Sequence, residues 1–195
     1  MSDRLDHPFP LRPSANASTE RKLGWEQHHS FVVLRAWWQG LEHDKGERAA
    51  LKRAGSLTAV MLSPAFHRLM RELRQAGFGV AEARYPKLAA IAGLVARLKP
   101  DKPEPLESIG NRMGTSKTRD GKKAVVSELR VRNILARDDI EDLYALLRRA
   151  LALLDDQANL ADLAAVVWHW SPMDEKRPND PRRQMACDYY AEVPL

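Results

Sequence analysis

Lysine and arginine side chains gathered in two windows are the residues of this sequence best suited to bind a ligand, since cations contact phosphate without regard to base identity. Residues 44–74 carry seven Lys or Arg against three acids, and Lys52 and Arg53 are adjacent there. Residues 112–149 begin with a loop rich in Gly, Ser, Thr and cations, which stays solvated or lies on phosphates. For each window the alternative is an ordinary solvated surface.

The charge pattern of the second window indicates four candidate contacts to nucleic acid. They are Arg112, Lys122, Lys123 and Arg148. Arg148 extends the basic side into a following helix, where Arg149 is its neighbour. Within the loop, the backbone amide of Gly114 also suits a sugar–phosphate contact.

A predicted helix over residues 127–137 places Arg130 and Arg132 on opposite flanks of an apolar face. Leu129 projects away from that face, so we expect little of this helix to be free for water. Arginines on a covered helix need partners, because burying an unpaired charge is costly. Internal acids and an external polyanion are both open as partners. We expect an internal acid for Arg132 and external use of Arg130.

Catalytic and metal-binding patterns are missing from the sequence. His28 and His29 are consecutive, so on a helix they point about 100° apart and do not readily chelate one ion. Residues 110–117 vaguely resemble a phosphate loop but lack its Gly-Lys-Ser/Thr ending. Cys187 is followed directly by Asp188, whose negative charge disfavours a thiolate nucleophile. We therefore predict a protein that is not an enzyme and holds no metal or cofactor.

Apolar residues at three- and four-residue steps predict that helices position these cations, and no hairpin signal predicts a strand pair. We therefore predict an all-α protein. The expected helices span residues 24–42, 47–54, 63–77, 85–98, 106–113, 127–137, 139–154, 160–170 and 182–191.

Capping residues support several of these helices. Ser63-Pro64 predicts a helix start, because Ser caps the free backbone amides and Pro suits the first helical position. Gly77 predicts the end of that helix. Asp138-Asp139 and Asn159 are placed to cap the later helices. The tryptophans of the apolar helices, Trp38 and Trp168 above all, are predicted to be core residues rather than base-stacking ones.

Composition changes along the chain predict two small helical bundles joined by a proline-rich linker. Residues 1–22 are predicted to be a disordered tail, and residues 23–98 an N-terminal helical domain. The segment 99–105, which holds three prolines, is predicted to be the linker. Residues 106–195 are predicted to form the C-terminal helical bundle.

A formal charge of +5 and a sequence pI of about 9.5 favour a polyanionic partner, either nucleic acid or an anionic membrane. The longest window without Asp, Glu, Lys or Arg, residues 54–67, is shorter than the ~18 residues that a membrane-spanning helix needs. A single cysteine excludes an internal disulfide and suits a reducing cytoplasm. We expect a cytoplasmic protein that does not bind a membrane.

Five sequence blocks occur in the order found in one known family. They are Trp37-Trp38-Gln39, residues 46–54 (GERAALKRA), residues 64–69 (PAFHRL), residues 127–132 (SELRVR) and residues 186–190 (ACDYY). Together these blocks resemble the CasB family, the small subunit of the type I-E Cascade CRISPR surveillance complex.

The resemblance implies a non-catalytic, all-helical subunit whose basic surface binds nucleic acid without sequence preference in antiviral defence. That surface would stabilise the guide RNA paired with target DNA and would track the displaced strand. Matched positions assign the leading strand contacts to Lys52, Arg53 and Arg130. The implied partners are CRISPR RNA, target and displaced DNA, a CasC-type backbone subunit, other Cascade subunits and a second copy of this chain.

Two other classes of function remain open on the sequence alone. One is a free-standing helical DNA- or RNA-binding regulator, which an exposed recognition helix would favour. The other is a protein–protein adaptor whose basic face meets acidic partners.

Overall fold

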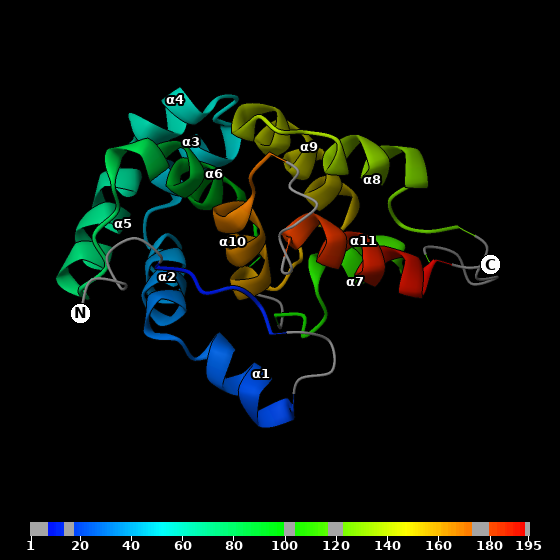
Figure 1. Cartoon of the computed structure of the whole chain (residues 1–195). Helices are drawn as coiled ribbons and strands as arrows, with labels where there is room; N and C mark the ends of the chain where they lie inside the picture. The colour runs from blue at the N-terminus through cyan, green and yellow to red at the C-terminus, as the bar shows by residue number, and fades with distance from the viewer. Residues whose placement is uncertain (1–7, 14–17, 100–103, 117–122, 173–179, 194–195) are drawn as a thin grey trace. The chain divides into compact units, whose positions relative to one another are not determined.

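The computed structural model describes residues 8–13, 18–99, 104–116, 123–172 and 180–193 (Figure 1). Over these residues the chain consists of helices and turns without a strand, apart from one isolated bridge between Ser116 and Ala124. The predicted all-α class is therefore confirmed. None of the helices in these ranges is long and apolar enough to cross a membrane.

The chain divides into two compact units, an N-terminal unit (Met1–Arg97) and a C-terminal unit (Leu98–Leu195). The N-terminal unit contains α1 (Thr19–Glu26), α2 (His29–Gly40), α3 (Lys45–Arg53), α4 (Leu57–Met61), α5 (Pro64–Gln75), the 3-10 turn η1 (Glu82–Arg84) and α6 (Tyr85–Val95). The C-terminal unit contains α7 (Ile109–Gly114), α8 (Glu128–Leu135), α9 (Ile140–Leu153), α10 (Leu160–His169) and α11 (Pro181–Glu192). Most of the expected linker, residues 100–103, lies outside the described residues, and the domain bounds stay a prediction.

Helix α6 forms the centre of the N-terminal unit. All its residues from Leu88 to Val95 are buried, as expected for a helix that is apolar on every side. It contacts α3, α4 and α5, which supply apolar side chains such as Leu51, Val60 and Leu69 to the same core. Trp38 is also buried there, as the sequence predicted.

The local capping signals are confirmed where the sequence placed them. The Ser63 hydroxyl accepts the Phe66 backbone N–H at 3.2 Å at the start of α5. After that helix, Gly77 adopts the left-handed region with φ +87°, which glycine reaches without steric cost. Asp139 and Asn159 cap α9 and α10 in the same manner as Ser63.

The first two helices differ from the expectation of one helix over residues 24–42. The chain breaks at His28, whose backbone is extended (φ −56°, ψ 135°), and α2 begins at the next residue. Part of the expected tail also packs, because the Phe9 ring is buried and stacks on Phe31 with centroids 5.6 Å apart. The Trp25 indole N–H donates to the Pro10 carbonyl at 3.0 Å and holds this segment in place. Such long-range contacts leave no local pattern in the sequence.

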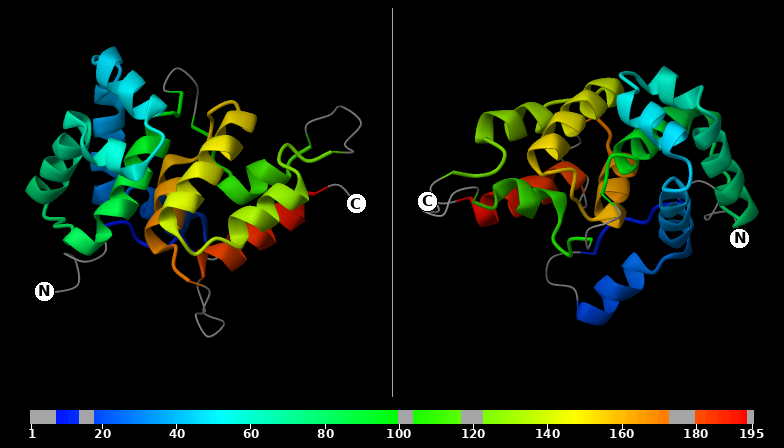
Figure 2. Two further views of the ribbon diagram at one scale, coloured as in Figure 1. Left: turned by 90° about the horizontal axis from the view of Figure 1, so that it is seen from above. Right: turned by 180° about the vertical axis from the view of Figure 1, so that it is seen from behind.

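Helices α7 and α11 make the closest packing in the C-terminal unit (Figures 1 and 2). A Cβ atom at Gly110 would lie 2.7 Å from the Met185 carbonyl oxygen and 2.7 Å from the Asp188 Cβ. A Cβ atom at Gly114 would collide with the Tyr189 carbonyl oxygen. The expectation that the Gly114 amide serves sugar–phosphate contacts is wrong, because this residue is buried against α11.

We expect Gly110→Ala or Gly114→Ala to lower the free energy of unfolding by about 1–3 kcal/mol, because the added methyl group forces α7 away from α11. Gly40→Ala is the matched control, since a Cβ at that last residue of α2 meets no atom within 4 Å. It should stabilise the chain by about 0.5–1 kcal/mol through helix propensity. Chemical denaturation of the full chain checks both signs. A stabilising effect at Gly110 or Gly114 would show that the helices are not in contact there.

Candidate nucleic-acid interface

Helix α3 carries the candidate cations of the N-terminal unit. The Asp44 carboxylate accepts the Glu47 backbone N–H at 2.9 Å and begins the helix. Arg48 Nε donates to the Ala96 carbonyl at 3.2 Å and ties α3 to the end of α6. With Leu51 buried, Lys52 is half-buried and Arg53 is exposed at the helix C-terminus, where the helix dipole favours a positive charge.

The neighbouring helix α5 carries an arginine stripe in which one member is neutralised. Arg68 Nη2 lies 2.6 Å from a Glu47 carboxylate oxygen, and this ion pair joins α5 to α3. Arg71 and Arg74 are exposed and make no ion pair with any described residue. Within this helix the sequence offers only Glu72 as an acid, and an acid on another helix is not visible in helical spacing.

Helix α8 carries two exposed arginines, of which only Arg132 has an ion pair with a described residue. Arg132 Nη2 lies 2.7 Å from Glu128 Oε1, and the Tyr190 hydroxyl donates to the same oxygen at 3.0 Å. A hydrogen bond with Tyr190 and the charge of Glu128 raise the pKa of Arg132. The expected internal partner of Arg132 is therefore confirmed. Arg130 is exposed and has no ion pair among the described residues.

The expectation that α8 is largely covered is wrong. Leu129 is 70% exposed, so the face opposite Val131 and Ile134 meets water rather than protein. Only these two residues of the helix are buried. Arg130 therefore needs no internal partner, since it lies on an open helix surface.

Helix α9 has two adjacent arginines in different surroundings. The Arg148 guanidinium carbon lies 5.4 Å from the centre of the Tyr144 ring, and its side chain is half-buried. Arg149 is exposed and makes no ion pair with the described part of the chain. The sequence analysis selected Arg148 and not Arg149, although nothing in the local pattern distinguishes two consecutive cations on a helix.

Arg130 and Arg149 line one groove between α8 and α9. The groove has a volume of about 240 Å³ and is otherwise lined by Val126, Asn133, Ile134, Leu146 and Ala150. Figures 1 and 2 show the two helices side by side. The structure thus brings the predicted Arg130 together with an arginine that the sequence analysis did not select.

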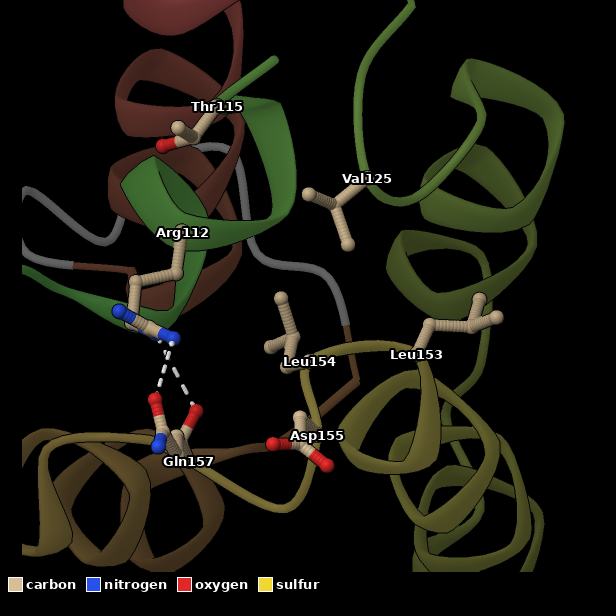
Figure 3. Close-up of a pocket in the computed structure, with 7 residues that line it drawn as sticks. All are labelled: Arg112, Thr115, Val125, Leu153, Leu154, Asp155 and Gln157. Atoms are coloured by element: carbon tan, nitrogen blue, oxygen red, sulfur yellow. Dashed lines mark hydrogen bonds between the residues drawn. The ribbon is translucent and has the colours of Figure 1, made fainter. Parts of the chain in front are cut away.

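Arg112 lines a different pocket of about 240 Å³ (Figure 3). Its Nε donates to the Gln157 backbone carbonyl at 3.2 Å, and its Nη2 donates to Gln157 Oε1 at 3.4 Å. Asp155 contributes a carboxylate to the same lining. Of the two loop lysines, Lys123 is exposed and Lys122 lies outside the described residues. The contacts of Arg112, Lys122 and Lys123 with nucleic acid stay predictions.

Comparison with protein families decides the identity of the chain. The family model of CRISPR-associated protein Cse2 matches residues 47–190, which is most of the sequence and includes most of α3 and all of α5, α8 and α9. The chain belongs to the Cse2 family. This family is the small subunit of type I-E Cascade, also called CasB, so the resemblance drawn from the sequence blocks is confirmed. Comparisons with curated proteins and with solved structures find no significant match.

As a Cse2-family member, the chain is a subunit of a Cascade CRISPR complex. Its matched region contains every candidate cation that the sequence selected, from Lys52 to Arg148. Among the described residues, no three His, Cys, Asp or Glu side chains gather in a way that could hold a metal ion.

The last helix of this Cse2-family chain fixes both ends of α8. The Tyr189 hydroxyl donates to the Val126 carbonyl at 2.9 Å, just before α8 begins. Arg182, which is 3% exposed, donates to the Arg137 carbonyl and to an Asp138 carboxylate oxygen, both at 2.7 Å, just after α8 ends. The sequence analysis missed both residues, because their partners are far away in the chain.

Burial raises the pKa of Tyr189 above its usual 10.0, and the charges of Glu128 and Tyr190 add to the shift. A phenol with a raised pKa stabilises the fold fully below about pH 10 and loses that contribution as the pH rises through the folded-state pKa.

We expect Tyr189→Phe to lower the free energy of unfolding by about 1 kcal/mol at pH 7, because the Val126 carbonyl loses its donor.

The same variant should lose less stability between neutral pH and pH values above 10 than the unmodified chain does. Urea denaturation across this pH range measures the difference. Tyr85→Phe is the control, since that hydroxyl makes no hydrogen bond with a described residue and Tyr85 lies in the N-terminal unit. Identical alkaline losses with and without the Tyr189 hydroxyl would contradict the assignment.

Proposed function

We propose that this chain is a non-catalytic Cascade subunit that binds single-stranded nucleic acid through exposed cations, without sequence preference. The family match over residues 47–190 carries the proposal. It is supported by the exposed Arg53 on α3 and Arg130 on α8, neither of which is neutralised by a described residue. Each unit of the chain thus offers its own cations to phosphate.

The energetics of strand exchange explain why such a subunit is useful. A guide RNA–target DNA hybrid is about as stable as the DNA duplex that it replaces, so protein contacts to the backbone decide whether the open state persists. The guide supplies sequence recognition, and the small subunit needs only to hold phosphates. Arginine suits this task because its planar fork binds phosphate oxygens in pairs.

The proposed partners follow from the same role. They are CRISPR RNA, the target and displaced DNA strands, a CasC-type backbone subunit, and a second copy of this chain within the complex. We place this activity in the cytoplasm, where invading DNA meets the complex. Among the seven cations selected from the sequence, Arg53, Lys123 and Arg130 are exposed and form the core of the proposal. Lys52, Arg112, Lys122 and Arg148 remain proposed as additional contacts.

Binding of a single strand by the full chain should weaken steeply with salt, with log affinity falling linearly against log salt concentration. Each phosphate contact on a single strand contributes roughly 0.7 to the magnitude of that slope. We expect Arg53→Gln and Arg130→Gln each to reduce the slope by about 0.7, because each removes one proposed contact. Fluorescence anisotropy with oligo(dT) at several salt concentrations measures this.

Two paired arginines provide matched controls for loss of charge. Arg68→Gln removes a cation bound to Glu47, and Arg132→Gln removes one bound to Glu128. Both change the net charge as the test variants do but should reduce the slope less, since each of these arginines must leave its acid before it can contact phosphate. Salt-independent affinity of the unmodified chain, or equal slopes for all four variants, would refute the proposal.

In the reconstituted Cascade complex, the double variant Arg53→Gln/Arg130→Gln should shorten the lifetime of the open DNA complex by roughly tenfold, through the loss of two phosphate contacts. The matched double variant Arg68→Gln/Arg132→Gln should shorten the lifetime less, because both arginines are already paired with acids. Dissociation of the displaced strand can be followed by fluorescence after a competitor is added. Unchanged lifetimes in both double variants would exclude these surfaces from strand contact.

A further inference from the structure

The groove between α8 and α9 combines two exposed arginines with an apolar lining. We propose that it holds one unstacked nucleobase of a bound single strand, with the adjoining phosphate on Arg130 and Arg149. The inference deepens the proposed function, on which it rests. It changes the binding mode from phosphates alone to phosphate plus base.

The charges around the groove favour an anion. Its seven lining residues include two arginines and no acid. Neither Arg130 nor Arg149 forms an ion pair with a described residue, although Arg132 and Arg137 of the same region are paired with Glu128 and Asp142. Two guanidinium groups at one opening suit a phosphate better than a single isolated cation does.

The groove also offers a surface for an aromatic ring. Leu146 is half-exposed at the groove, while Val126, Ile134 and Ala150 are buried beneath it. Guanidinium planes stack on bases much as aromatic side chains do, and the Asn133 amide can donate to and accept from a base edge. The volume of about 240 Å³ is below the roughly 300–1,000 Å³ of sites for drug-sized ligands, so it suits a fragment such as one base.

The lining is held in place before any ligand binds. The Val126 carbonyl accepts the Tyr189 hydroxyl, and Ile134 is 1% exposed in the core. Arg182 holds the turn between α8 and α9 through the Arg137 carbonyl. A fixed apolar surface costs little ordering entropy when a flat ring packs on it.

The Arg112 pocket is less suited to an anionic ligand than the groove between α8 and α9 (Figure 3). It has the same volume, but its guanidinium is already hydrogen-bonded to Gln157, and its lining includes the carboxylate of Asp155, which is paired with Lys99. An anionic ligand there would have to displace internal bonds and approach a carboxylate. The α8–α9 groove has neither obstacle, so the two pockets form an internal comparison.

A nucleotide fits the groove better than an acidic peptide does. A nucleotide joins an apolar-faced ring directly to an anion, which matches a groove lined by both apolar side chains and arginines. A peptide would also bring backbone N–H donors, and among the seven lining side chains only Asn133 supplies an acceptor for them. We therefore commit to a nucleobase as the occupant.

The test measures the affinity of the full protein chain for two strands with the same number of phosphates. One is oligo(dT), and the other is the same backbone with abasic sites. The unmodified chain should bind oligo(dT) about fivefold more tightly, because only that strand can place a base in the groove. Leu146→Ala should remove this preference while leaving the salt slope intact. Leu153→Ala, the same change on the same helix at the Arg112 pocket, should preserve the preference.

Each outcome decides between specific interpretations. A base preference that survives Leu146→Ala would overturn base insertion in this groove, while the salt-dependent binding of the proposed function would stand. Absence of any binding by the unmodified chain would instead overturn the proposed function itself. Competition by a peptide of alternating Glu and Leu, lost in Leu146→Ala and stronger than competition by oligo(dT), would assign the groove to a protein partner and overturn the inference.

Asn133→Asp provides a second variant in case Leu146→Ala perturbs folding. The side chain is exposed, and the change adds a carboxylate at the groove with almost no change in shape. It should lower the affinity for both strands several-fold by repelling phosphate from Arg130 and Arg149. An unchanged affinity for both strands would show that nothing anionic occupies the groove.

Discussion

The contact between α7 and α11 is the constraint on which the rest of the C-terminal unit depends. Gly110 and Gly114 let the backbones of the two helices meet without intervening side chains. The Ser108 hydroxyl, just before α7, donates to the Asp188 carboxylate at 2.7 Å and fixes the register of the pair. Helix α11, once seated, holds α8 at its start through Tyr189 and at its end through Arg182. The position of Arg130 therefore depends on two residues that carry no side chain.

The arginines of this protein differ in availability rather than in number. Arg68 and Arg132 are neutralised by acids at 2.6 and 2.7 Å, and Arg182 is buried against the Trp170 ring at 4.8 Å. Arg53 and Arg130 lie on helix surfaces without such partners among the described residues. Sequence charge density counts all five equally. The pairing of Arg132 with Glu128, four residues earlier, can be predicted from the sequence, whereas the partners of Arg68 and Arg182 are distant in the chain. Desolvation and pairing set the cost of moving each charge onto phosphate.

The features that could be predicted from the sequence depend on residues close together in the chain. The caps at Ser63, Asp139 and Asn159 and the left-handed Gly77 depend on neighbours within a few residues, and all four were identified. The all-α class and the family resemblance were also found, since helical periodicity and ordered sequence blocks are properties of the chain itself.

The missed features join residues that are distant in the sequence. Phe9 on Phe31, Arg182 on the Arg137 carbonyl and the glycines of α7 against α11 leave no periodic trace. The exposure of Leu129 was missed for the same reason, because an amphipathic pattern shows which face is apolar but not whether a second element covers the other face. Arg149 was passed over in favour of Arg148, although the structure half-buries Arg148 near the Tyr144 ring and leaves Arg149 exposed.

The glycine-mediated fit of α7 on α11 also limits how this protein can be recombined with its homologues. Residues 104–116 and 180–193 are one inseparable module although much of the unit lies between them in the chain. A chimera that exchanges α11 alone would present an unmatched surface to Gly110 and Gly114. A chimera that exchanges both segments would keep the contact between α7 and α11. A side chain gained at Gly110 or Gly114 would have to be compensated by space on α11.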